Sequence, residues 1–374
     1  MKGVIVENVR VKSIPFFDSS RPCVKKCLEY IKSTKLGNGL DLADLEPEQE
    51  LRFVLKKSCS SFANALRRCF IEEIPVKSFS VAPSNIQTDD QFILYEEIIE
   101  HLTSIPISQD ITFEEMETWV VSVNVHNKND NIMTVYSNDI QISNGKKAIG
   151  TKKIFSPTIP ICVLHPGKFI RITKIFISTK KGYEDGKHII MKNPYYKILD
   201  MEPFVPVKSA GPSPYQHTGT SCLEQDPTQF EIGFTTHRTT ESSHVMLLCC
   251  DTLAERLINI KKHMETFLEE KKDMPYNTTK ITLSVKDNLV HLEMFDEYYT
   301  LAKLVSHYCY IVKPDIHFVA HYLYHPLIRN GYVKISRESN NPIQIFVKAI
   351  EEILKDLNTV RDAFKDVKVK NTFP

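Results

Sequence analysis

Histidines are the residues of this sequence that first suggest chemistry, because several lie close together near the C-terminus. His317 and His321 share a predicted strand, and His325-Pro326 follows it at once. Imidazole groups at such spacing can hold a metal ion or transfer a proton. However, His317 and His321 fall on one strand face with Val319, and no cysteine lies at ligand spacing. We therefore expect structural histidines, and we expect Pro326 to end the strand.

The other catalytic signals in the sequence are weak. The glycine-containing segment 182 to 188, GYEDGKH, lacks the Lys followed by Ser or Thr of a phosphate-binding loop, and it opens no clear helix. No GxSxG nucleophile elbow occurs. Adjacent carboxylates on predicted helices diverge, so they are poor pairs for general acid and base catalysis. These pairs are Glu72-Glu73, Glu96-Glu97 and Glu351-Glu352.

Two consecutive arginines suggest contact with a partner rather than catalysis. Arg67 and Arg68 lie on a predicted helix, where adjacent side chains point about 100° apart. One of them can reach a partner while the other pairs with Glu72 or Glu73. Asn64 can cap a neighbouring loop. The alternative is a simple solvated helix face.

A short set of elements positions these residues. Residues 51 to 56 alternate as a half-buried strand, and the following helix repeats apolar residues every four positions until Pro75. We expect one serine to cap this helix. The candidates are Ser58, Ser60 and Ser61. VKSFSVAP then predicts a second strand, and a further helix ends near Ile105-Pro106.

A similar order recurs near the C-terminus. Residues 281 to 286 and 290 to 295 predict strands, Thr300 caps the next helix, two more strands follow, and a long helix starts at Pro342. Its apolar stripe needs a helical partner, and residues 252 to 270 carry a comparable stripe. The residues expected to pair are Leu253, Leu257 and Met264 with Phe346, Ile350, Ile353, Leu357 and Val360.

The expected fold class is α+β, with two similar units packed through their long helices. The first unit is discontinuous and surrounds a β-rich inserted domain with a loop-rich end. A short polar linker joins the two units. The expected boundaries are 1–108 and 226–270 for the first unit, 109–225 for the inserted domain, 271–280 for the linker and 281–374 for the second unit.

Composition limits the possible classes of protein. The chain has 374 residues, enough for two or three domains of roughly 150 residues. Its net charge of +1 provides no global basic excess for nucleic acid, so any contact with DNA is local or indirect. The first residues do not read as a secretory signal, and no apolar run approaches a membrane span. We expect an intracellular protein whose nine cysteines are reduced.

Two stretches resemble a known family. Residues 62 to 85 and 96 to 107 resemble the assembly motif of the alpha-like subunits of cellular RNA polymerases, and ANALRR at 63 to 68 is the most specific part. Residues 298 to 327 resemble the smaller partner in that system and end in His-Pro-Leu. The order of both units in one chain is similar to the fused alpha-like subunits of large cytoplasmic DNA viruses.

The resemblance implies a non-catalytic assembly and scaffold subunit that forms an intramolecular heterodimer and recruits the two largest polymerase subunits. It implies further contacts with smaller subunits, one copy per complex, only indirect contact with DNA, and no membrane. If the source is viral, it places the chain in the host cytoplasm or the virion. The implied contact residues are Asn64, Arg67, Arg68, Glu96, Ile105, Pro106, His325 and Pro326.

The sequence also departs from the family. His101 stands where the family has an arginine, so the contacts of that arginine are not carried over. Tyr95 replaces an aspartate, and Tyr298 replaces a polar residue. Some alpha-like subunits hold an iron-sulfur cluster or zinc through four cysteines in the inserted domain, but here only Cys162 and Cys222 are present, so we expect neither cofactor.

Two other classes of function stay open at this point. One is a stand-alone intracellular enzyme or ligand-binding protein with a cleft around the inserted domain, which would need convergent polar groups in a pocket. The other is a scaffold of a different complex that uses the same dimerisation fold. Co-purification with large polymerase subunits distinguishes both from the polymerase interpretation.

Overall fold

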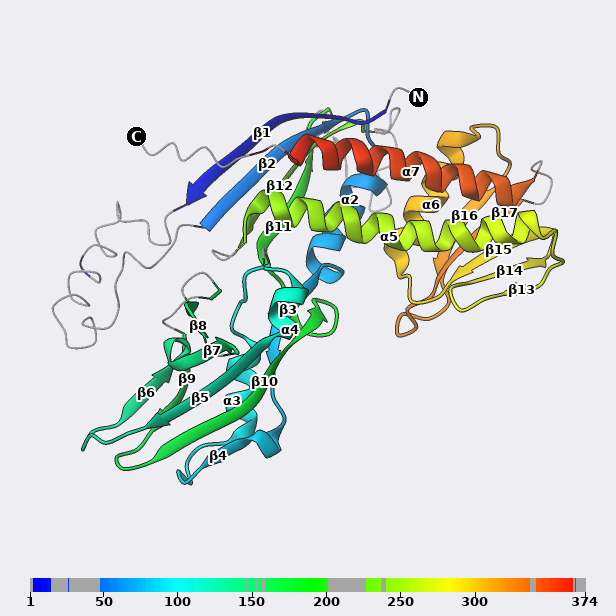
Figure 1. Ribbon diagram of the computed structural model, residues 1–374. Coiled ribbons are helices and arrows are strands. Elements are labelled where there is room, and N and C mark those ends of the chain that lie inside the picture. The colour runs from blue at the N-terminus through cyan, green and yellow to red at the C-terminus, as the bar shows by residue number, and fades with distance from the viewer. Residues whose placement is uncertain are drawn as a thin grey trace, which may run out of the picture.

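The computed structural model has an α+β fold, as the sequence predicted (Figure 1). It describes residues 3–14, 26, 48–109, 111–145, 147–151, 154–155, 159–200, 227–236, 240–336, 341–365 and 367. Cys222 and the loop-rich end of the expected inserted domain therefore lie outside the described residues.

The first sheet is antiparallel and has the strand order β1-β2-β12-β11. Its strands are β1 (Ile5–Ile14), β2 (Glu48–Lys56), β11 (Met191–Ile198) and β12 (Gln229–Thr236). The predicted alternation of β2 buries Leu51, Phe53 and Leu55, since successive side chains of a strand point to opposite faces. Phe53 lies opposite Ile232 of β12 in the register, so both strands contribute to one apolar face.

A second antiparallel sheet lies near the C-terminus and has the order β13-β14-β15-β17-β16. Its strands are β13 (Tyr276–Asn277), β14 (Ile281–Lys286), β15 (Leu289–Met294), β16 (Val319–Leu323) and β17 (Gly331–Ser336). The short β13 lies within the segment expected to be a linker. Without β13, the two sheets have the same topology. In each, the fourth strand in sequence pairs with the second, and the third strand lies at the edge beside the fourth.

The helices occupy equivalent places in the two units. α2 (Ser60–Glu72) and α6 (Tyr299–Val312) each follow the second strand of their sheet. α5 (Ser242–Glu269) and α7 (Pro342–Phe364) each follow the fourth. The sequence predicted this recurrence, but it assigned VKSFSVAP to the first unit's sheet, and that assignment was wrong because the sheet is completed by strands far along the chain.

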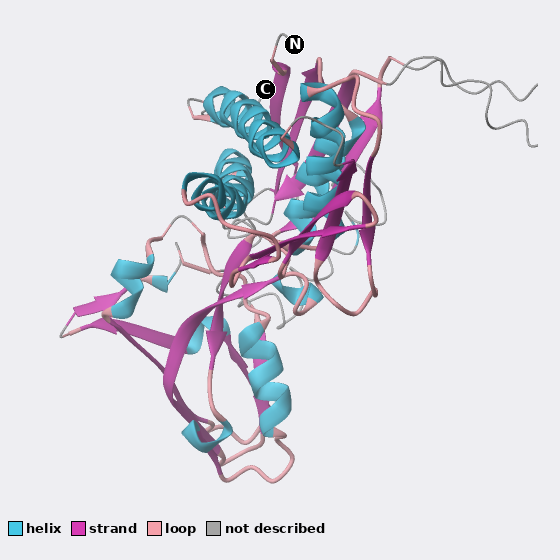
Figure 2. Cartoon of the chain, turned by 90° about the vertical axis from the view of Figure 1, so that its right-hand side faces the viewer, coloured by secondary structure: helices cyan, strands magenta, loops and turns pink. Residues whose placement is uncertain are grey.

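The two long helices pack against each other in an antiparallel pair, which Figure 2 shows nearly end-on. Asp251 of α5 pairs with Arg361 of α7, while Lys261 of α5 pairs with Glu351 of α7. The two helices therefore run in opposite directions. The facing sides of the two helices form one buried apolar layer. It contains Leu253, Leu257, Met264, Phe346, Ile350, Ile353, Leu357 and Val360, each at most 1% exposed.

One apolar core joins both units. Phe364, at the end of α7, stacks edge-on against Phe53 of the first sheet with ring centres 5.0 Å apart. Asp356 of α7 accepts hydrogen bonds from the Tyr308 hydroxyl (2.7 Å) and from the Val4 backbone N–H (3.2 Å). The second unit therefore completes the core of the first, and neither sheet has a separate apolar core.

The inserted region has its own sheet and core. The sheet has the order β3-β10-β5-β7-β8, with β4 paired to β10 and with β6 and β9 forming a separate ribbon. Its elements are β3 (Pro75–Ser80), β4 (Ile86–Thr88), α3 (Tyr95–Thr103), α4 (Phe113–Glu117), β5 (Trp119–His126), β6 (Met133–Tyr136), β7 (Ile140–Asn144), β8 (Lys147–Ile149), β9 (Pro160–Leu164) and β10 (Phe169–Lys181).

These placements differ from the expected boundaries of the inserted domain. Its core begins at Phe79, before residue 109, and β11 belongs to the first unit's sheet although it precedes residue 225. The antiparallel strands β3 and β10 connect the two parts, and Figures 1 and 2 show the inserted region extending away from the helix pair.

Local helix starts also differ from expectation. No side chain caps α2, whose N-cap residue is Cys59, so the three serines do not have the predicted role. Thr300 lies inside α6, whose N-cap residue is Tyr298. α5 begins at Ser242, earlier than its apolar stripe predicted. None of the helices that the structure describes combines the length and apolar character needed to span a membrane.

The antiparallel helix pair makes a testable prediction about stability. Leu357→Asp places an unpaired carboxylate where the native side chain is 1% exposed, so we expect the free energy of unfolding to fall by about 4 kcal/mol. Urea denaturation measures this change. The matched control is Asn358→Asp at the neighbouring exposed position of α7, which should change the free energy by less than about 0.5 kcal/mol. Equal stability of both variants would contradict the packing described.

Candidate subunit-assembly site

α2 presents one narrow polar stripe and buries the rest of its surface. Phe62, Leu66 and Phe70 are buried in the core of the first unit. The partly exposed positions among the described residues of α2 are Ser60, Asn64, Arg67, Arg68, Ile71 and Glu72. The helical repeat places these positions side by side, so the sequence-predicted contact residues Asn64, Arg67 and Arg68 share one stripe.

The two arginines of this stripe have different partners. Arg68 pairs with Glu72 at 2.6 Å, as the i,i+4 spacing predicted, and its guanidinium lies 5.6 Å from the ring centre of Tyr298 in the second unit. Arg67 donates from Nε and Nη2 to Asn64 Oδ1, at 3.1 and 3.0 Å. In the described part of the chain, no carboxylate pairs with Arg67. Arg68 is therefore engaged within the molecule, while Arg67 offers a positive charge at the surface.

A buried ion cluster lies at the C-terminal end of α2. Glu73, which is 5% exposed, receives Arg256 of α5 at 2.9 Å on one oxygen and Arg329 of the second unit at 3.0 Å on the other. Arg256 Nε also donates to Glu297 at 2.7 Å, and Arg329 Nε donates to Asp296 at 3.2 Å. Glu73 therefore connects the first unit to the second.

Neighbouring carboxylates keep Arg256 of this cluster charged. Burial opposes the charge of Arg256, but the carboxylates of Glu297 and Glu73 more than offset burial and raise the pKa of its guanidinium. A guanidinium so placed stays protonated at every pH at which the protein folds. Removal of either carboxylate would leave a buried positive charge without its full set of partners.

The inserted region reaches the same cluster through the turn after β10. The Tyr183 backbone N–H donates to the Glu72 carbonyl oxygen at 3.2 Å, and the Arg329 guanidinium lies 3.8 Å from the Tyr183 ring centre. A Cβ atom at Gly182 would lie 2.0 Å from the Ile71 carbonyl oxygen, so only glycine permits this approach. The segment expected to be a plain loop thus contacts both units.

The remaining sequence-predicted contact residues are spread over the molecule. Glu96 is exposed in the first turn of α3, and Pro106 is half-buried behind that helix. Ile105 is 1% exposed in the inserted core, so the expectation of a direct contact by its side chain was wrong. His325 and Pro326 lie in an exposed turn after β16.

Sequence reasoning missed the apolar side chains around that turn. Tyr324 is 80% exposed and Leu327 is 87% exposed. Apolar residues so exposed at a structured turn often mark a contact surface. The sequence contained a signal for this exposure. The residues Tyr-His-Pro-Leu-Ile at 324 to 328 follow neither a helical nor a strand repeat that would place all their apolar side chains on one buried face.

The histidines have structural hydrogen bonds. His321 Nε2 lies 2.9 Å from the Tyr299 hydroxyl, and burial lowers the pKa of its imidazole. Leu327 donates its backbone N–H to His325 Nδ1 at 3.2 Å. Within the ranges that the structure describes, no three His, Cys, Asp or Glu side chains are placed to hold a metal ion. Burial raises the pKa of Cys162 to about 12, which disfavours a thiolate ligand.

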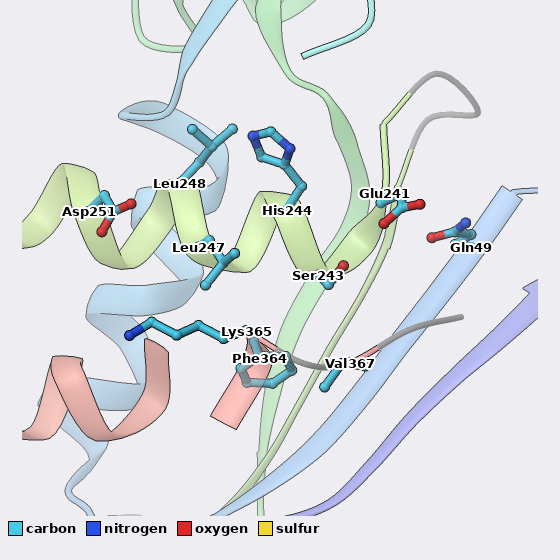
Figure 3. A pocket seen from close by; sticks show the side chains of 10 residues that line it. All are labelled: Gln49, Glu241, Ser243, His244, Leu247, Leu248, Asp251, Phe364, Lys365 and Val367. Carbon is cyan, nitrogen blue, oxygen red and sulfur yellow. The ribbon is translucent and has the colours of Figure 1, made fainter. Parts of the chain in front are cut away.

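A hollow of about 760 Å³ lies where the start of α5 meets the end of α7, and Figure 3 shows the side chains that line it. Leu247 points toward Phe364, whereas Leu248 and His244 point to the other side of α5. The lining residues are Gln49, Glu241, Ser243, His244, Leu247, Leu248, Asp251, Phe364, Lys365 and Val367.

Comparison with known proteins relates this geometry to a family. The chain is 24% identical over 368 residues to the DNA-directed RNA polymerase RPB3-11 homolog of African swine fever virus, covering 94% of this chain and 92% of that protein. It is 29% identical over 179 residues to RNA polymerase subunit Rpo3 of Pyrococcus furiosus, covering 64% of that subunit. It is 30% identical over 82 residues to subunit Rpo11 of Pyrobaculum aerophilum, covering 88% of it.

The chain belongs to the family of alpha-like DNA-directed RNA polymerase subunits. It combines the two types of unit that Rpo3 and Rpo11 represent as separate proteins. The Rpo3 and Rpo11 matches cover 45% and 22% of this chain, whereas the match to the viral homolog covers 94%. No protein-family model matches the chain. In this alpha-like subunit, the ion cluster around Glu73 lies where the two units and the inserted region meet.

The ion cluster makes the second prediction. Glu73→Gln keeps the side-chain volume but leaves Arg256 and Arg329 without a shared counter-charge, so we expect a loss of about 3 kcal/mol in the free energy of unfolding. Urea denaturation at pH 7 measures the loss. The control is the adjacent Glu72→Gln, whose ion pair with Arg68 is partly exposed and should contribute less than about 1 kcal/mol. An equal effect of both variants would contradict the special role of Glu73.

Proposed function

We propose that this alpha-like subunit is a non-catalytic assembly and scaffold subunit that recruits the two largest subunits of a DNA-dependent RNA polymerase. The observation that carries the proposal is the fusion of two units of the same sheet topology around one apolar core. A platform of two joined sheets offers a large rigid surface to partners. In this proposal, smaller subunits also bind, and each complex contains one copy of the chain.

Fusion has a clear physical advantage for assembly. Two separate units would pay the entropic cost of association each time they met, whereas tethered units meet at a millimolar effective concentration. Their pairing buries the apolar faces of α5 and α7, which would otherwise be exposed patches prone to aggregation. Pairing therefore no longer depends on the relative abundance of two gene products.

The proposed contact surface has two parts. One is the α2 stripe, where Arg67 and Asn64 offer hydrogen-bond donors to carboxylates or backbone carbonyls of a large subunit. The other is the turn with His325 and Pro326, flanked by the exposed Tyr324 and Leu327. Glu96 and Pro106 are proposed contacts of the inserted region. The domain division expected from the sequence stays a proposal with the boundaries adjusted above.

Nucleotide addition belongs to the partners in this proposal. Such chemistry needs carboxylates that hold metal ions near the growing chain. The subunit works wherever the polymerase works, which is the host cytoplasm or the virion if the source is viral. The proposal includes only indirect contact with DNA, and the net charge of +1 provides no global basic excess for nucleic acid.

The proposal predicts what co-purifies with the tagged chain. At about 0.5 M salt, exposed charge contacts weaken while large apolar interfaces persist. We expect stoichiometric recovery of two very large polymerase subunits, detected by mass spectrometry. Recovery of the chain alone would favour the enzyme or ligand-binding alternative. Recovery of a different complex without either large subunit would favour a scaffold of another assembly.

The α2 stripe predicts a separable assembly defect. Arg67→Glu should leave the melting temperature within about 2 °C, because no carboxylate in the described residues depends on this arginine. Recovery of the large subunits should fall about tenfold or more. Arg171→Glu on β10 is the matched control, since it reverses an exposed arginine of the inserted region. Unchanged recovery with Arg67→Glu would exclude the proposed role of the stripe.

A further inference from the structure

The inserted region extends away from the helix pair (Figure 1), and an exposed apolar cluster lies at the start of its helix α3. Phe92 is 79% exposed, Leu94 is 56% exposed and Tyr95 is 36% exposed. Single exposed apolar residues are common, but three large ones within four positions form a patch that water solvates poorly. We call Phe92, Leu94 and Tyr95 the Phe92 patch.

The Phe92 ring is held in place although it projects into solvent. A buried carboxylate, Asp90, accepts the Phe92 backbone N–H at 3.2 Å on one oxygen. Its other oxygen accepts both the backbone N–H and the ring Nδ1 of His165, each at 2.9 Å. The Phe92 ring then packs on the His165 imidazole with ring centres 4.9 Å apart. One buried aspartate thus positions both rings.

The segment before Phe92 is attached to the long strand β10. Thr88 donates its hydroxyl to the Phe169 carbonyl oxygen at 2.7 Å, and Asp89 accepts the Phe169 backbone N–H at 2.8 Å. The Asp90 backbone N–H donates to the Thr88 hydroxyl oxygen at 3.1 Å. These hydrogen bonds already restrict the conformations of the turn. The turn therefore loses less conformational entropy when a partner binds.

The surroundings of the Phe92 patch are acidic. Residues 89 to 100 contain five carboxylates and no lysine or arginine, but Asp90 is buried against His165, Asp89 lies 3.8 Å from Lys168 and Glu100 lies 3.2 Å from Lys187. Glu96 and Glu97 are exposed beside the patch, and no ion-pair partner for either occurs in the described ranges. An apolar centre with a negative rim is complementary to an apolar pocket with a positive rim. A second copy of the same patch would be repelled by the same charges.

We propose that the Phe92 patch is a docking surface for another polymerase subunit, which receives the Phe92 ring in an apolar pocket rimmed by lysine or arginine. The inference rests on the proposed assembly function and adds a contact to it. This surface is distinct from the α2 stripe and from the turn at His325. Buried aromatic side chains at the centre of an interface contribute a large share of binding free energy, so Phe92 is the expected anchor.

Photo-crosslinking identifies the occupant directly. The probe is p-benzoylphenylalanine incorporated at position 92 of the full tagged chain in cells that assemble the polymerase. We expect a cross-link to one polymerase subunit, mapped by mass spectrometry to an apolar residue near lysines or arginines. The same probe at Phe176, 53% exposed on β10, is the matched control and should not reach that site. A cross-link from position 92 to a second copy of the chain, or none at all, overturns the proposal.

Substitution tests the energetic contribution. Phe92→Asp should reduce recovery of that one subunit about tenfold in the assembled complex and leave the other subunits and the melting temperature unchanged. The double variant Glu96→Lys with Glu97→Lys should weaken binding of the same subunit at low salt. The difference in recovery between this variant and the native chain should be smaller at high salt, because salt screens exposed charges. Phe176→Asp should have no effect. Full recovery with Phe92→Asp overturns the docking surface alone, whereas failure of the native chain to recover any polymerase subunit overturns the proposed function.

Discussion

A buried ion cluster at the end of α2 constrains how the parts of this alpha-like subunit are arranged. Glu73 receives one arginine from α5 and one from the second unit, and Arg329 also stacks on Tyr183 of the inserted region. Unpaired charges are costly to bury, so the cluster is satisfied only when all three parts are in place. Desolvation offsets much of the attraction within such a network, so breaking it costs more free energy than forming it contributes.

Burial of apolar side chains supplies most of the folding free energy, whereas the ion cluster restricts how the parts are arranged. The facing stripes of α5 and α7, together with both sheets, form one core across two units of equal topology. Phe364 of the last helix packs on Phe53 of the second strand, so the second unit contributes to the core beside the first sheet. The two units therefore share one core and are not two separately packed domains joined by a tether.

Sequence reasoning succeeded where a local period carried the information. The stripes at Leu253 and Leu357, the alternation of β14 and β15, and the i,i+4 pair of Arg68 with Glu72 follow from helix and strand geometry alone. It was less successful where one sequence pattern is compatible with two different places in the fold. VKSFSVAP alternates well enough for either sheet, and an apolar Ile105 fits a surface contact or a core equally well.

By itself, the sequence determined the fold class, the recurrence of two units, the long helices and the resemblance to alpha-like subunits, since each depends on residues near one another in the chain. Only the tertiary structure decided which strands complete the first sheet, which side chains meet at Glu73, and that Asp90 holds Phe92 outward on His165. Apart from the short bond between Asp90 and Phe92, those contacts join residues far apart in sequence. Their energies depend on burial and distance, and no local pattern of residues records either quantity.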